Sequence, residues 1–181
     1  MKIILIRHGM TEGNLKRRYI GTTDEDLINT DCLKGDYPKC ERVVASPLKR
    51  CIQTAEYIYP NVDIEICDKL KECDFGDFEN KSYEDLKDNP DYQKWIDSNG
   101  ELPFPNGETH EDFKNRCKDG FFESLTERDT AFVIHGGSIM AIMQKLFGGN
   151  FYDYQVKNGC GYEFEMRNGE IVDDYSPIGC S

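Results

Sequence analysis

The first residues of the chain place the strongest constraint on its fold. Lys2 is followed by four consecutive apolar residues, Ile3 to Ile6, and the apolar run ends at Arg7 and His8. Such an unbroken run is typical of a strand that is buried on both faces of a parallel sheet, because a strand with one exposed face would alternate apolar and polar residues. The sequence therefore predicts that the chain begins with an inner strand of an α/β sheet.

The two cationic side chains that end this strand indicate a ligand site. Ligands of open α/β sheets bind at the carboxyl ends of the strands, which is where Arg7 and His8 fall. Gly9 has no Cβ atom, so the backbone can approach a bound group closely. An imidazole can act as a nucleophile, and a guanidinium binds an oxyanion through paired hydrogen bonds. Phosphate is therefore the first candidate for the bound group.

A second segment repeats this arrangement. Residues 130–134 form another apolar run, which ends at His135 and is followed by Gly136, Gly137 and an apolar helical pattern. The two strand ends can lie side by side in an α/β sheet, with the first amides of the following helix directed at a bound anion. Two core histidines with satisfied hydrogen bonds are the alternative interpretation.

Arg50 is a candidate for the same site. A short apolar strand at 42–45 leads into a helix predicted over 46–59, with Ser46 as its cap and Pro47 at its first position. Arg50 falls in the first turn of this helix, where a cation opposes the helix dipole and calls for a compensating anion. An ordinary surface arginine is the alternative, but this position also lies at a strand's carboxyl end, so Arg50 can meet Arg7 over one pocket.

The loop that follows the first strand adds candidate substrate contacts. Residues 11–24 are rich in hydroxyl, amide and basic groups, and a polar loop of this kind is commonly only solvated. This loop leaves the carboxyl end of the first strand, however, so it should overhang the site. Asn14, Gly21 and Thr22 are therefore predicted to contact the substrate.

Glu72 is the candidate general acid or base. It lies in an acidic loop, residues 68–79, that also contains Phe75 and Phe78. Shielding by these aromatic side chains would raise the pKa of a carboxyl group toward neutral pH and suit it to proton transfer. The loop pattern alone does not distinguish Glu72 from the neighbouring acids.

The remaining patterns complete an α/β fold. Residues 62–67 alternate as in a half-exposed edge strand, two short helices between 82 and 96 suggest a helical lid at about 80–105, and Thr109 caps a helix running to about residue 126. His110 in that helix is expected to be a surface residue. Asn168-Gly169 between alternating segments predicts a hairpin. We therefore expect one domain over 1–181, a three-layer α/β/α sandwich whose mostly parallel sheet ends in a C-terminal antiparallel hairpin.

Composition limits the partners. The 181 residues carry a formal net charge of −12, which argues against a nucleic-acid or anionic membrane surface. The apolar runs are too short to span a bilayer. Eight cysteines occur without a CxxC motif or a signal peptide, so we expect reduced thiols and a cytoplasmic protein.

Five segments together resemble the histidine phosphatase superfamily, whose members are phosphoglycerate mutase-like proteins. The matching segments, in order, are Leu5–Asn14, Ser46–Ala55, Glu72–Glu79, Pro105–Thr109 and Ile134–Gly137. The resemblance implies that His8 is the nucleophile that receives a phosphoryl group and that Glu72 is the proton donor. It also implies that Arg7, Arg50 and His135 bind the phosphoryl oxygens. No metal or other cofactor is implied.

The chain departs from the family pattern at a few positions. Met10 stands where the family commonly has Glu, Cys51 where Ala is usual, and Asn80 where Gly is usual. None of these positions carries one of the five chemical roles. Between residues 27 and 43 the family usually has a full helix, whereas this chain has a shorter stretch that contains Pro38. The sequence therefore does not show what covers one face of the sheet.

The resemblance leaves three functions to separate. A phosphatase that hydrolyses small-molecule phosphomonoesters is favoured, because the chain is short and lacks the long insertions associated with cofactor-dependent phosphoglycerate mutases. Within the compact phosphatases it looks most like the α-ribazole phosphatases, which suggests α-ribazole 5'-phosphate as a substrate. A mutase and a non-catalytic phosphate-binding module are the alternatives. The sequence does not specify the natural substrate or the oligomeric state.

Overall fold

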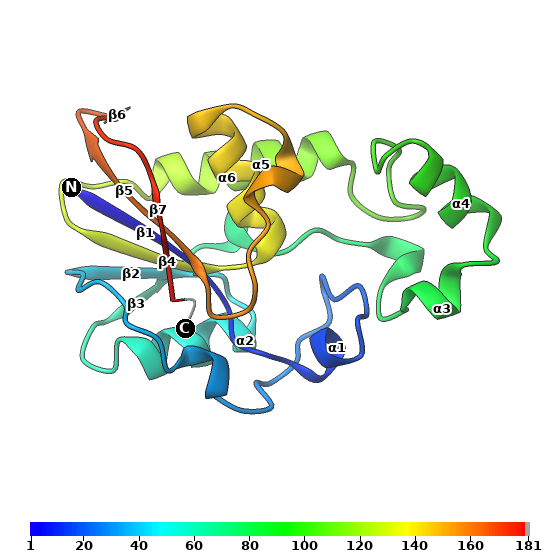
Figure 1. Cartoon of the computed structure of the whole chain (residues 1–181), viewed down its shortest axis with the longest axis horizontal. Helices are drawn as coiled ribbons and strands as arrows, with labels where there is room; N and C mark the ends of the chain where they lie inside the picture. Colours follow the sequence, from blue (N-terminus) through cyan, green and yellow to red (C-terminus); the bar gives the residue numbers. More distant parts are fainter. Residues whose placement is uncertain (180–181) are drawn as a thin grey trace.

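A computed structural model describes residues 1–179 and is built around one sheet (Figure 1). The strand order is β3-β2-β4-β1-β5-β6, with β7 paired to β5. β3, β2, β4 and β1 are parallel, whereas β5, β6 and β7 add antiparallel pairs. The strands are β1 (Lys2–Arg7), β2 (Arg42–Ala45), β3 (Ile64–Ile66), β4 (Thr130–Ile134), β5 (Gly161–Arg167), β6 (Glu170–Ile171) and β7 (Ser176–Ile178). The predicted fold class is confirmed.

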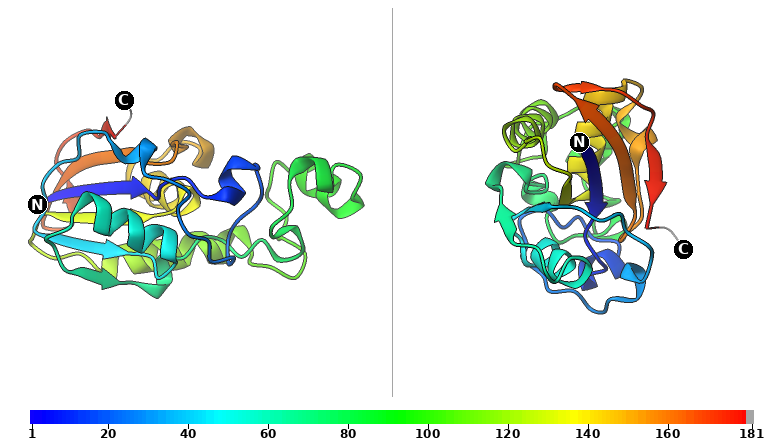
Figure 2. Two further views of the ribbon diagram at one scale, coloured as in Figure 1. Left: turned by 90° about the horizontal axis from the view of Figure 1, so that it is seen from below. Right: turned by 90° about the vertical axis from the view of Figure 1, so that its left-hand side faces the viewer.

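Helices cover both faces of the sheet, as Figure 2 shows. Because side chains alternate along β1, Ile3 and Leu5 pack into the core on the side of α5 (His110–Glu123) and α6 (Gly136–Phe147). Ile4 and Ile6 pack on the opposite side against α2 (Lys49–Ile58). All four side chains are fully buried, so the apolar run is buried on both faces as predicted.

The register of the parallel strands sets the position of the histidines. Arg7 at the end of β1 lies opposite Ile134 at the end of β4. The backbone N–H of His8 then donates to the carbonyl of Ile134 at 3.0 Å. His8 and His135 therefore leave the same edge of the sheet side by side, as the sequence predicted.

The start of α2 differs from the prediction. The helix begins at Lys49, its N-cap residue is Leu48, and no side chain caps it. The Ser46 hydroxyl instead lies 2.8 Å from Nε2 of His135, so the prediction of Ser46 as a cap is wrong because this side chain is used in a tertiary contact. Arg50 does lie in the first turn of α2.

The shortened segment before β2 covers the sheet without a full helix. It contains a single 3-10 turn, η1 (Asp31–Leu33), and the side chains of Tyr37 and Cys40 pack against the core on the α2 side. The Tyr37 hydroxyl donates to the Gly159 carbonyl at 2.7 Å, and the Tyr59 hydroxyl donates to the Pro38 carbonyl at 3.0 Å. Irregular backbone held by tyrosine hydroxyls thus replaces the helix of the family pattern.

Two short helices, α3 (Tyr83–Leu86) and α4 (Pro90–Asp97), project away from the sheet (Figure 1). Ser82 caps α3 as predicted, while Asn89 caps α4 and Pro90 is its first residue. Helices this short are only marginally stable by themselves, because they contain few hydrogen bonds. Edge-to-face aromatic contacts hold the segment together, including that of Phe78 with Phe104, whose ring centroids are 5.9 Å apart. The remaining short elements are α1 (Glu12–Leu15), η2 (Asp68–Leu70), η3 (Gly76–Phe78) and η4 (Phe151–Tyr154).

The C-terminal hairpin confirms the turn prediction. Asn168 and Gly169 adopt φ values of 54° and 80°, the left-handed conformation that a two-residue turn of this kind requires. Met166 then pairs with Ile171 across the turn. No helix within residues 1–179 has the length and apolar character needed to cross a bilayer.

Within residues 1–179, six cysteines are free thiols, in agreement with the expected reduced state: Cys32, Cys40, Cys51, Cys67, Cys73 and Cys117. The expectation is wrong for Cys160, which is disulfide-bonded. Disulfide formation depends on tertiary proximity, which the spacing of cysteines along this chain did not indicate. Cys180 lies outside the described residues.

Close packing of β5 on β1 leads to a stability prediction at Gly161. A Cβ atom at this position would lie 1.7 Å from the Leu5 carbonyl oxygen, so Gly161→Ala should push the two strands apart and lower the free energy of unfolding by about 3 kcal/mol. Urea-induced unfolding measures this loss. The matched control is Gly169→Ala, where a Cβ atom meets nothing within 4 Å but φ is +80°, so the cost should be only about 1 kcal/mol. Equal losses in the two variants would contradict this account.

Candidate active site

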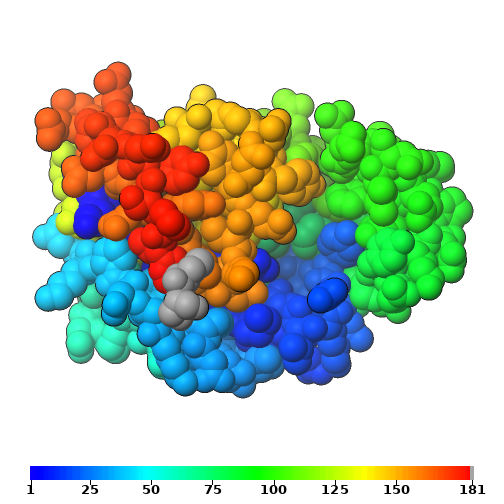
Figure 3. Space-filling view, in the orientation of Figure 1, coloured from blue at the N-terminus to red at the C-terminus, as the bar shows by residue number. Residues whose placement is uncertain are grey.

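A pocket of about 980 Å³ opens at the carboxyl ends of β1 and β4. Its lining includes residues of these strand ends, the loop after β1, the segment 72–75, the region of α4, and η4. Figure 3 shows the recess between the segment that contains α3 and α4, in green, and the segment around residues 150–158, in orange. A cavity of this volume is in the range of small-molecule sites.

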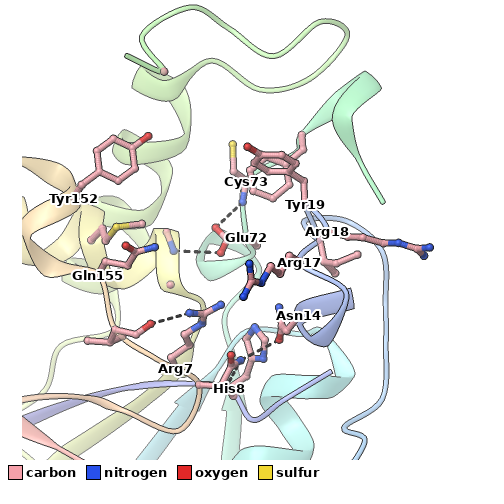
Figure 4. A pocket seen from close by; sticks show the side chains of 18 of the residues that line it. Arg7, His8, Asn14, Arg17, Arg18, Tyr19, Glu72, Cys73, Tyr152 and Gln155 are labelled. Atoms are coloured by element: carbon pink, nitrogen blue, oxygen red, sulfur yellow. Dashed lines mark hydrogen bonds between the residues drawn. The ribbon is translucent and has the colours of Figure 1, made fainter. Parts of the chain in front are cut away.

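His8 lies at the inner end of this pocket (Figure 4). It is buried, and its Nδ1 lies 2.7 Å from the Gly9 carbonyl. Nδ1–H therefore donates to that carbonyl, which leaves the lone pair of Nε2 free. Burial, and then the charges of Arg50 and Arg7, hold the pKa of His8 well below 6.5. The side chain is thus a neutral imidazole in the tautomer that a nucleophile needs.

Asn158 fixes the backbone that carries His8. Its side-chain amide donates toward the carbonyls of His8 and Gly9 at 3.0 and 3.1 Å and toward Oδ1 of Asn14 at 3.0 Å. The N–H of Gly9 donates to the Thr54 hydroxyl at 2.8 Å. Asn158 and Asn14 both line the pocket. The amide of Asn158 thus ties the loop after β1 to a segment that is far away in the sequence.

Arg7 is the guanidinium in the pocket wall. Its Nη1 donates to the Val156 carbonyl at 2.7 Å, while its Nε is buried without a hydrogen-bond partner. A buried donor without a partner is costly. Arg7 therefore holds an unused N–H group beside His8.

Arg50 and His135 are fully buried and are not among the residues that line the pocket. Arg50 donates to the carbonyls of Thr23 at 2.7 Å and Gly21 at 3.0 Å. The ring of His135 packs edge-on against that of His8, with the centroids 5.2 Å apart. Burial, and then Arg50, hold the pKa of His135 well below 6.5. Both side chains thus stand directly behind the inner end of the pocket.

Glu72 lies across the pocket from His8 and Arg7 (Figure 4). Its carboxylate accepts the N–H of Cys73 at 3.0 Å and that of Gly137 at 3.2 Å. Burial raises the pKa of Glu72 above its ordinary 4.5, and the two N–H donors and the nearby arginines partly oppose this rise. The group is therefore better suited than an exposed carboxyl group to hold a proton and then release it.

Two residues position Glu72. The Arg116 guanidinium donates to the carbonyls of Lys69 at 2.8 Å and Lys71 at 3.0 Å, and it pairs with Glu108 at 2.7 Å. Gly137 allows α6 to approach, since a Cβ atom there would lie 2.4 Å from Oε1 of Glu72. The loop that carries the carboxylate is thus clamped by an ion pair and a glycine contact.

Five of the predicted site residues line the pocket together: Arg7, His8, Asn14, Glu72 and Gly136. Gly21 and Thr22 do not line it. The N–H of Gly21 donates to the Glu79 carboxylate at 2.9 Å, and Thr22 is exposed. The loop is held by Glu79, so its backbone faces that carboxylate rather than the pocket.

The structure adds pocket residues that the sequence analysis missed. Arg17 and Lys157 make the rim basic, and Figure 4 shows the Arg17 side chain between Glu72 and Asn14. Arg17 has a φ of 54°, and a left-handed non-glycine residue is often found at a functional site. His110 was expected at the surface, but it lines the pocket and packs edge-on against Phe151 at 4.6 Å. Nothing in the local sequence pattern marked these three side chains.

Within the described part of the chain, no group of three or more His, Cys, Asp or Glu side chains is arranged to hold a metal ion. The pocket instead contains a neutral imidazole, a guanidinium with an unused N–H, and a carboxyl group with a raised pKa. With these groups, the imidazole can attack the central atom of a bound oxyanion ester, and the carboxyl group can give a proton to the leaving oxygen.

Comparison with known proteins agrees with this chemistry. The sequence profile of the histidine phosphatase superfamily (branch 1) matches residues 3–173. An uncharacterized phosphatase, PhoE, of Bacillus subtilis is 32% identical over 94% of this chain and 92% of its own length. The adenosylcobalamin/alpha-ribazole phosphatase of Salmonella typhimurium is 25% identical over 93% and 92%. The fold is shared with a putative alpha-ribazole-5'-P phosphatase from Escherichia coli, with a TM-score of 0.84, 22% identity, and coverage of 100% of this chain and 96% of that one.

Proposed function

The chain belongs to the histidine phosphatase superfamily, and we propose that it is a metal-independent phosphomonoester phosphatase that acts through a covalent phosphohistidine on His8. One observation carries the proposal. A neutral imidazole with a free Nε2 lies in one pocket with the Arg7 guanidinium and with a carboxyl group whose pKa is raised. Relatives named as phosphatases support the same assignment.

In the first step Nε2 of His8 attacks phosphorus. The nitrogen–phosphorus bond forms while the bond from phosphorus to the ester oxygen breaks, and Glu72 gives its proton to that oxygen. The ring becomes cationic as it bonds to phosphorus, and the hydrogen bond from Nδ1–H to the Gly9 carbonyl stabilises that charge. The neutral starting state means that no proton has to leave the nucleophile first.

In the second step water attacks the phosphohistidine. The Glu72 carboxylate left by the first step takes the proton of the water, the nitrogen–phosphorus bond breaks, and inorganic phosphate leaves. His8 returns to its neutral form and Glu72 to its protonated form. One carboxyl group thus serves as acid and then as base, which requires a pKa near the working pH.

The family resemblance gives Arg7, Arg50 and His135 to the phosphoryl oxygens, and of these we assign direct contact to Arg7, which lines the pocket. Arg7 acts from the pocket wall through its unpaired Nε. Arg50 and His135 stand behind that wall, so Arg50 contributes positive charge at short range and His135 supports the ring of His8. Positive charge of this kind stabilises the loose transition state of phosphoryl transfer without a bound metal ion.

The finer assignments belong to the same proposal. The substrate is a small-molecule phosphomonoester, with α-ribazole 5'-phosphate as the specific candidate because an α-ribazole phosphatase is among the relatives. The enzyme is a single domain over 1–181 with a lid at about 80–105, and its proposed location is the cytoplasm. The net charge of −12 argues against nucleic acid as a partner.

A panel of phosphomonoesters assayed in EDTA tests the function. We expect release of inorganic phosphate at an undiminished rate, because the pocket supplies its own positive charge.

A second assay separates a phosphatase from a mutase. With 3-phosphoglycerate and catalytic 2,3-bisphosphoglycerate, we expect inorganic phosphate to form at least as fast as 2-phosphoglycerate forms. Faster isomerisation would favour a mutase, loss of activity restored by a divalent metal would overturn metal independence, and binding without turnover would favour a phosphate-binding module.

His8→Ala tests the covalent step. The variant should lose about three or more orders of magnitude in turnover, since removal of a nucleophile leaves only binding and charge stabilisation. Quenching wild-type enzyme in alkaline denaturant with phosphorus-labelled substrate should trap a base-stable, acid-labile label that His8→Ala does not accumulate. His110→Ala, which removes the other histidine that lines the pocket, serves as the matched control and should still be labelled. Equal labelling of His8→Ala would remove His8 from its role.

Glu72→Gln tests the proton donor through pH dependence. His8 must be neutral and its pKa lies well below 6.5, so protonation of His8 should lower kcat/KM on the acidic side of the profile. Glu72 must be protonated and its pKa lies above 4.5, so kcat/KM for an alkyl phosphate should fall as pH rises through that pKa. Glu72→Gln should remove this second limb and lower the rate by about two to four orders of magnitude. The kcat/KM of p-nitrophenyl phosphate, which reports the first step with a leaving group that needs no proton, should be much less affected. An equal loss of kcat/KM for both substrates would contradict the assignment.

A further inference from the structure

The pocket is much larger than a phosphoryl group, and its outer part is aromatic. The polar groups assigned to the phosphoryl group gather at the inner end, so the outer part is left for the rest of the substrate. The aromatic side chains that line the pocket are Tyr19, Phe75, Trp95, Phe104, Phe113, Phe151 and Tyr152. The side chains of this outer part therefore contact the leaving group of the substrate.

Two aromatic walls face each other above the inner end. Tyr19 packs edge-on against Phe75 at 5.3 Å and against Trp95 at 6.1 Å, which makes one wall. Figure 4 shows Tyr152 on the opposite side, with Glu72 between the walls. A Cβ atom at Gly100 would lie 2.9 Å from the Tyr152 hydroxyl and 3.2 Å from Cζ2 of Trp95. The walls thus converge at Gly100, and we call the space between them the aromatic slot.

The aromatic slot is uncharged. The Tyr19 hydroxyl is hydrogen-bonded to that of Tyr92 at 2.9 Å, and burial together with this contact raises the pKa of Tyr19. Burial also raises the pKa of Tyr152, so neither phenol ionises near neutral pH. Among the described residues that line the pocket, Glu72 is the one acid, and it lies at the inner end. The aromatic side chains of the slot therefore present only π faces and neutral hydroxyl groups, and the basic side chains of Arg17 and Lys157 lie at the rim of the same pocket.

Tyr152 leaves much of its surface uncovered. The residue is 51% exposed although it lines the pocket. A planar ring from a substrate could cover this face and the opposite wall at once, with the stacked or edge-on geometry that aromatic pairs prefer. A small leaving group without a ring would leave the slot unfilled and would gain none of these aromatic contacts.

We propose, resting on the phosphatase function above, that the substrate is a phosphomonoester with a planar aromatic leaving group held in the aromatic slot between Tyr152 and the wall of Tyr19 and Trp95. The phosphoryl group then reaches His8 at the inner end while the ring occupies the slot. Selection acts on the shape and aromatic character of the leaving group. Small phosphorylated acids such as O-phosphoserine and 3-phosphoglycerate are poor substrates for this pocket.

The test compares two esters matched in chemistry. Benzyl phosphate and cyclohexylmethyl phosphate both release an unactivated primary alcohol of similar size, and they differ in the flat aromatic ring. Wild-type enzyme should show a kcat/KM about tenfold higher for benzyl phosphate, since two aromatic contacts are gained. O-phosphoserine should be slower than either ester. Because one enzyme sample is used for both esters, the ratio does not depend on the fraction that is folded.

Tyr152→Ala assigns the preference to the slot. This side chain is half exposed, so its loss should not unfold the protein, and the ratio should fall to about two to three. Tyr57→Ala is the matched control, because Tyr57 is 45% exposed on α2 and does not line the pocket; its ratio should equal that of the wild type. Trp95→Leu should lower the ratio in the same direction as Tyr152→Ala.

The outcomes separate this proposal from the proposed function. A wild-type ratio near one, or equal ratios in Tyr152→Ala and Tyr57→Ala, would overturn the aromatic slot while hydrolysis of both esters left the phosphatase assignment in place. Failure to hydrolyse either ester or any other phosphomonoester would overturn the phosphatase assignment and, with it, the slot.

Discussion

The parallel pairing of β1 with β4 is the interaction on which the rest of the site depends. Its register ends with Arg7 opposite Ile134, and the ladder continues for one more bond, from the N–H of His8 to the Ile134 carbonyl. The two histidines must therefore leave the sheet together. Since His135 is also the N-cap residue of α6, the same pairing brings the amide of Gly137 to the Glu72 carboxylate.

Four arginines of this chain form two pairs that differ in the groups they bind. Arg42 and Arg116 are paired with Glu65 and Glu108. Within residues 1–179, Arg7 and Arg50 form no salt bridge, and their hydrogen bonds go to backbone carbonyls. A carbonyl satisfies a donor without cancelling its charge. The positive charge at the pocket therefore remains available to an anion, and it also lowers the pKa of His8.

Local patterns predicted most of the fold. The apolar run of β1, the turn at Asn168 and the cap at Thr109 all appear as expected, because each depends on residues within a few positions of one another. The cap assigned to Ser46 failed for the opposite reason. Its hydroxyl has a partner 89 residues away, in His135, and no local rule contains that partner.

The sequence by itself determined that Arg7, His8 and His135 stand at strand ends, because burial on both faces and the end of an apolar run are visible in the order of residues. It did not determine that the 20–23 loop is turned toward Glu79, that Asn158 holds the backbone of His8, or that Tyr152 faces Tyr19. Only the tertiary structure decided these, because each depends on the distance between segments far apart in the chain, and that distance is set by how the strands and helices pack together.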